Sequence, residues 1–107
     1  MTTYKILVVD DLKDNLISIV NMIGEMEGEY EVYQANSGEL ALEILKKYIP
    51  DLIIMDWEMP GMSGIKTTQK IKEQEHTKDI PVIICTGIMT SSEHLETAFQ
   101  VGAVDYI

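Results

Sequence analysis

Short apolar runs alternate with amphipathic stretches along most of this chain. Residues 4–9, 52–55 and 80–85 are largely apolar, and isoleucine and valine are common in them. These runs are too short for typical helices, so they predict strands that are buried on both faces. Residues 30–35 alternate between apolar and polar positions, which indicates an edge strand. Residues 103–107 are expected to form a fifth strand.

Four helices are expected between these strands, because apolar residues recur there at helical spacing. The first should be capped near Asp14, the second should begin after Asn36, the third at Ser63 and the fourth after Thr90. The third has the narrowest apolar stripe, so we expect it to be the least deeply packed of the helices.

The regular alternation of strand and helix predicts an α/β fold of three layers, with helices on both faces of a parallel sheet. A chain of 107 residues suits one domain, residues 1–107. The formal net charge is -10 and no basic patch is visible, so we do not expect this chain to bind nucleic acid. The single Cys85 fits a reducing compartment, and no apolar stretch reaches the roughly 18 residues of a membrane span. We therefore expect a cytoplasmic chain without a membrane segment.

Three of the predicted strands end in polar residues. Asp10 and Asp11 follow the first, Asp56 follows the third and Thr86 follows the fourth. Because the carboxyl ends of parallel strands share one edge of a sheet, these side chains can converge. Crowded carboxylates need a cation or a proton between them, and oxygen ligands suit Mg²⁺. A carboxylate beside Mg²⁺ can attack phosphorus to give an aspartyl phosphate, and a threonine hydroxyl can hydrogen-bond a phosphoryl oxygen.

This pattern resembles the receiver domain of two-component response regulators. The matching motifs are the acidic pair Asp10–Asp11, the D-x-x-M-P-x-M-x-G signature from Asp56 to Gly64, Thr86–Gly87, and G-A-x-D-Y-I from Gly102 to Ile107. The resemblance implies a flavodoxin-like, doubly wound sheet of five parallel strands in the order 2-1-3-4-5. It also implies a regulatory domain that receives a phosphoryl group from a histidine kinase or phosphotransfer protein, and not an enzyme in its own right.

The resemblance implies a role for each site residue. Asp56 is the phosphoacceptor. Asp11, Asp56 and the backbone carbonyl of Glu58 hold Mg²⁺, and Asp10 helps to position the ion.

Two further residues are implied to read the phosphorylated state. Thr86 supplies the switch hydroxyl, and Tyr106 is the aromatic side chain that rotates on phosphorylation.

The chain ends at Ile107, before the lysine and proline that follow the fifth strand in this family and before its last helix. We therefore expect weaker phosphorylation than in an intact receiver. Apolar side chains on one face of the sheet, drawn from Leu7, Val9, Ile54 and Ile84, should lose part of their cover. This predicts a homo-oligomer through that face, or a marginally stable monomer.

Two other functions are compatible with parts of the pattern. A pseudo-receiver would act as an interaction module whose output does not depend on phosphate. An aspartate-nucleophile phosphatase would need D-x-D spacing after the first strand, whereas Asp10 and Asp11 are adjacent. As a simpler alternative, these two residues could be helix caps.

Overall fold

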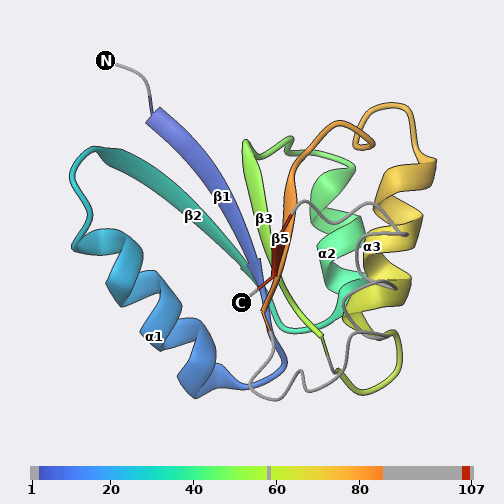
Figure 1. Cartoon of the computed structure of the whole chain (residues 1–107), viewed down its shortest axis with the longest axis horizontal. Coiled ribbons are helices and arrows are strands. Elements are labelled where there is room, and N and C mark those ends of the chain that lie inside the picture. The colour runs from blue at the N-terminus through green and yellow to red at the C-terminus, as the bar shows by residue number, and fades with distance from the viewer. Residues whose placement is uncertain (1–2, 58, 86–104, 107) are drawn as a thin grey trace.

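The computed structural model describes residues 3–57, 59–85 and 105–106 (Figure 1). The strands are β1 (Thr3–Val9), β2 (Glu29–Ala35), β3 (Leu52–Asp56), β4 (Val82–Cys85) and β5 (Asp105–Tyr106). The helices are α1 (Lys13–Gly24), α2 (Gly38–Leu45) and α3 (Gly64–Glu73). None of these described helices is both long enough and apolar enough to cross a membrane. The helix that we predicted after Thr90 lies outside the described residues.

All five strands pair in parallel, in the order β2-β1-β3-β4-β5. The connection from β1 to β2 contains α1, and the connection from β2 to β3 contains α2. Figure 1 shows α1 on one side of the sheet, with α2 and α3 together on the other. The predicted three-layer, doubly wound architecture is therefore confirmed.

Each face of the sheet has its own apolar cluster, because successive side chains of a strand point to opposite faces. Leu7, Val9 and Ile84 belong to the cluster under α2 and α3, and are 0%, 1% and 0% exposed. Ile54 is half-buried and packs against the cluster under α1. Of the four residues that we considered for the uncovered face, three are thus fully covered, and only Ile54 lies on the α1 side.

The prediction that α3 is the least deeply packed helix is wrong for the described part of the chain. Four of the 10 residues of α3 are buried, whereas only two of the 12 residues of α1 are. The buried residues of α3 include Thr67 and Thr68, which an apolar stripe does not count. A Cβ atom added to Gly38 would lie 2.1 Å from the Thr67 hydroxyl oxygen, which shows how closely α2 and α3 pack.

The helix starts agree with the sequence for two of the three described helices. Ser37 and Ser63 precede α2 and α3, and each accepts a hydrogen bond from a backbone N–H of the first turn. The cap that we expected at Asp14 is wrong, because Leu12 precedes α1 and its side chain makes no capping bond. Instead, the Asp10 carboxylate accepts a hydrogen bond of 2.9 Å from the backbone N–H of Leu12.

Candidate functional site: the acidic edge of the sheet

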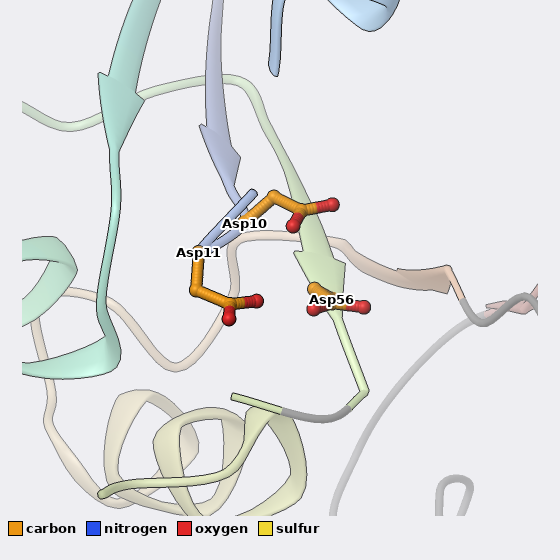
Figure 2. A group of neighbouring side chains, drawn as sticks. All are labelled: Asp10, Asp11 and Asp56. Atoms are coloured by element: carbon orange, nitrogen blue, oxygen red, sulfur yellow. The ribbon is translucent and has the colours of Figure 1, made fainter. Parts of the chain in front are cut away.

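Three aspartate side chains converge at the carboxyl ends of two neighbouring strands. Asp10 and Asp11 follow β1, and Asp56 is the last residue of β3. One carboxylate oxygen from each of the three lies within 4.8 Å of the others, and Figure 2 shows the three carboxyl groups gathered there. The convergence follows from the register, in which Val9 pairs with Met55 and so brings the next residues of both strands to one edge.

Asp10 is the most firmly held of the three side chains. It is 5% exposed, its backbone N–H donates to the Ala35 carbonyl at 3.1 Å, and its carboxylate accepts from Leu12 as described above. Asp11 and Asp56 are half-buried. The hydrogen bond from Leu12 fits the alternative that Asp10 is a helix cap. That alternative does not explain why the carboxyl groups of Asp11 and Asp56 lie close to the carboxyl group of Asp10.

Burial and the crowding of the carboxylates change the acidity of Asp56. Its pKa is raised from 3.8 to about 7, first by partial burial, then by the charge of Asp10 and by the adjoining carboxyl group of Asp11. A hydrogen bond from the Trp57 backbone opposes this shift. The site therefore favours either a proton on Asp56 or a cation shared by the three carboxylates.

The loop after β3 is folded back tightly against the end of the strand. The backbone N–H of Gly64 donates to the Trp57 carbonyl at 2.9 Å, and the Trp57 N–H donates to the Cys85 carbonyl at 3.0 Å. A Cβ atom at Gly64 would lie 1.8 Å from the Asp56 carbonyl oxygen. The last glycine of the signature is thus required by the close approach of α3 to the strand that carries Asp56.

Glu39 was not predicted from the sequence to contribute to the site. It lies in the first turn of α2, and its carboxylate accepts a hydrogen bond of 3.3 Å from the backbone N–H of Met62. Gly61, next to Met62, has a φ of 79°. Glu39 therefore supports the loop between β3 and α3. No sequence signal could have indicated this contact, because the two residues are 23 positions apart and meet only through the fold.

Three of the predicted site residues are described partly or not at all. Thr86 and the backbone of Glu58 lie outside the described residues. Tyr106 lies in β5 beside Ile84, and only its backbone is described. Cys85, which pairs with Asp56 in the sheet, has a thiol pKa raised first by burial and then by the charges of Asp56 and Asp10. This favours a neutral thiol.

The match to a known family covers nearly the whole chain. Residues 6–107 match the model of the response regulator receiver domain. The chain therefore belongs to the receiver domain family of two-component signalling, as its motifs predicted.

Relatives and solved structures agree with this assignment. A probable cyclic di-GMP phosphodiesterase of Vibrio cholerae is 41% identical over 102 residues, which are 95% of this chain but 22% of that relative. The chemotaxis protein CheY4 of Vibrio cholerae has a TM-score of 0.90 at 29% identity, over 99% of this chain and 86% of that one. The receiver domain of the histidine kinase CKI1 from Arabidopsis thaliana, solved in complex with Mg²⁺ and BeF₃⁻, has a TM-score of 0.83 at 26% identity, over 94% of this chain and 76% of that one. The chain thus has the flavodoxin-like receiver fold.

Proposed function

We propose that this chain is a phosphoacceptor switch, which takes a phosphoryl group from a histidine kinase or phosphotransfer protein onto Asp56 with the help of Mg²⁺. The observation that carries the proposal is the convergence of Asp10, Asp11 and Asp56 within 4.8 Å at the carboxyl edge of a receiver fold. In the same family, the CKI1 receiver was solved with Mg²⁺ and BeF₃⁻.

The residues present suit a divalent cation. Three carboxylates face one another, and their mutual repulsion contributes to the raised pKa of Asp56. A hard cation that prefers oxygen ligands relieves that repulsion. Asp11, Asp56 and the Glu58 carbonyl would hold the ion, and Asp10 would help to position it. When bound, Mg²⁺ supplies positive charge beside the oxygens of the transferring phosphoryl group.

Asp56 is the nucleophile in this proposal, and it reacts in its ionised form. A carboxylate oxygen of Asp56 forms a bond to phosphorus while the bond from phosphorus to the imidazole nitrogen of the donor breaks. The freed nitrogen keeps the electron pair of that bond and takes up a proton. The Thr86 hydroxyl hydrogen-bonds a phosphoryl oxygen of the product, and Tyr106 responds to that contact. These last two roles rest on the family motif.

The test is a time course with a small acyl phosphate as phosphodonor, with and without Mg²⁺, followed by intact-protein mass spectrometry. We expect a single phosphoryl adduct that needs Mg²⁺ and decays slowly after the donor is removed. Asp56→Asn should form no adduct. Asp14→Asn removes an exposed carboxylate from the first turn of α1 and should behave like the parent chain.

The same time course separates the alternatives. A pseudo-receiver would form no adduct at any Mg²⁺ concentration, and that result would contradict the proposal. A phosphatase would release many equivalents of phosphate per chain without accumulating an adduct, which would contradict it as well.

A further inference from the structure

A groove of about 670 Å³ runs between the C-terminal half of α1 and β2. Val20, Ile23 and Gly24 line it from the helix, and residues 29–32 line it from the strand. Among the described strands, β2 pairs only with β1, so the outer edge of β2 is available for pairing with an added strand. The groove therefore adjoins an open sheet edge.

The sheet face that lies under α1 gives the groove apolar walls. Tyr30 and Val32 are half-buried and pack against the cluster under α1. The ring of Tyr4 lies 6.2 Å from the ring of Tyr30, and Tyr4 is 53% exposed. Met26, in the turn that leads into β2, is 52% exposed. An apolar side chain that enters the groove would thus cover apolar surface that is now partly open to water.

The same segment carries a strip of acidic residues at every second position. Its members are all exposed: Glu25, Glu27, Glu29 and Glu31. Within the described part of the chain, none of the four has an ion pair within 4.0 Å, although Lys5 lies opposite Glu31 in the sheet. The hydroxyl groups of Thr3 and Tyr33 donate to Glu29 and Glu31 at 3.4 and 2.9 Å. Hydroxyl donors leave the negative charge in place, so the strip favours a cationic partner.

We propose that this groove is a docking site for an extended, cationic segment of a partner protein, which adds to the free edge of β2. In such a segment, apolar side chains would point toward Tyr30 and Val32, and lysine or arginine side chains would alternate with them toward Glu29 and Glu31. A second copy of this chain is disfavoured, because pairing of two β2 edges would bring glutamates together. The acidic strip likewise disfavours nucleic acid.

The docking site lies far from the acidic edge along the strands. The groove adjoins the start of β2, where Thr3 pairs with Glu29, whereas Asp10 follows the other end of β1, where Val9 pairs with Ala35. The inference therefore does not depend on the proposed phosphorylation of Asp56, and its test can fail without affecting that proposal.

The experiment uses a fluorescein-labelled synthetic peptide in which lysine alternates with valine or isoleucine, titrated with the full chain at low salt and followed by fluorescence anisotropy. We expect saturable binding, and the double variant Glu29→Gln/Glu31→Gln should weaken it by about fivefold. The matched control, Glu73→Gln/Glu75→Gln, changes the net charge equally at exposed positions in and after α3 and should leave the affinity unchanged.

A second pair of variants tests the groove itself. A Cβ atom at Gly24 would meet no atom within 4 Å, so a side chain can start from this position in open space. Gly24→Trp should obstruct the groove and reduce binding, whereas Gly24→Ala should bind the peptide as the parent chain does. Circular dichroism confirms that each variant is folded.

Three results would overturn the proposal. Equal affinity for a peptide of the same composition with its lysines in one block would indicate general charge attraction without strand pairing. Equal weakening of peptide binding by both glutamine double variants would also indicate general charge attraction. Amide chemical shift changes that are absent from residues 20–35 on peptide addition, and occur elsewhere in the chain, would place the binding at another surface.

Discussion

At the scale of single residues, the carboxyl group of Asp56 combines two properties that oppose each other. Partial burial, together with the neighbouring acidic groups of Asp10 and Asp11, raises its pKa to about 7, yet its proposed reaction needs the ionised form. A cation at the site reconciles the two, because positive charge favours the carboxylate. If Asp56 has the proposed function, its protonation, metal binding and phosphorylation are therefore coupled.

This coupling predicts a pH dependence of stability in the absence of divalent cations. Because the pKa of Asp56 is raised from 3.8 to about 7 on folding, the folded chain binds this proton more tightly than the unfolded chain. The protonated carboxyl group of Asp56 thus contributes to the free energy of unfolding. This contribution is fully present below about pH 4 and is lost as the pH rises through about 7. Urea unfolding of the parent chain and of Asp56→Asn, at several pH values with a chelator, measures the difference.

Asp56→Asn should be more stable than the parent chain above about pH 7, and its advantage should shrink toward about pH 5. Asp14→Asn serves as the control for loss of a carboxylate elsewhere. Parallel stability curves for the parent and Asp56→Asn would show that the fold does not oppose ionisation of this group.

A second prediction concerns Gly64, whose missing side chain allows α3 to approach the strand. Gly64→Ala would place a Cβ atom 1.8 Å from the Asp56 carbonyl, so the backbone must shift, at a cost of about 1–3 kcal/mol. Gly24→Ala, in open space at the end of α1, should be neutral or stabilising by up to about 1 kcal/mol. Thermal unfolding of both variants tests this contrast, and equal stabilities would contradict the close approach.

At the scale of elements, α3 and the turn after it hold three buried threonines, and two of them, Thr77 and Thr68, differ in their surroundings. The Thr77 hydroxyl donates to the Ile71 carbonyl at 2.6 Å, where α3 ends. The Thr68 hydroxyl is fully buried and has no hydrogen-bond partner among the residues that the structure describes. The same chemical change at these two positions should therefore have opposite effects.

Thr77→Val should lower the free energy of unfolding by about 1–2 kcal/mol, because the Ile71 carbonyl loses its short hydrogen bond and keeps only the longer one, of 3.4 Å, from the Gln74 backbone N–H. Thr68→Val replaces a hydroxyl that has no partner in the described part of the chain with a methyl group of similar size, so it should be neutral or stabilising by up to about 1 kcal/mol. Urea unfolding measures both. A loss of stability in Thr68→Val as large as that in Thr77→Val would mean that the Thr68 hydroxyl has a partner after all.

The elements also show what the sequence could and could not predict. The strands were recognisable because their apolar runs end abruptly in polar residues, as in Met55 followed by Asp56. The depth at which α3 packs could not be predicted, because its buried positions include the polar residues Thr67 and Thr68, and Thr67 lies against α2 at Gly38. The contact of Glu39 with Met62 likewise exists only after the chain has folded.

At the scale of the whole molecule, the strand order explains why the site forms. β1 and β3 are neighbours at the centre of the sheet, so the acidic residues that follow them meet although they are far apart in the sequence. The sequence predicted this convergence, because any parallel sheet collects its carboxyl ends at one edge. The sequence did not predict which apolar residues face α1. That depends on which alternate residues of each strand point to that face of the sheet. A homo-oligomer through the α1 side stays a prediction.

The central claim is that Asp56 is the residue that receives the phosphoryl group. Treatment of the phosphorylated chain with borohydride reduces an aspartyl phosphate to homoserine, which tandem mass spectrometry locates. We predict homoserine at position 56, only after incubation with both phosphodonor and Mg²⁺, and none in Asp56→Asn. Homoserine at position 10 or 11 of the parent chain, or at no position, would contradict the account.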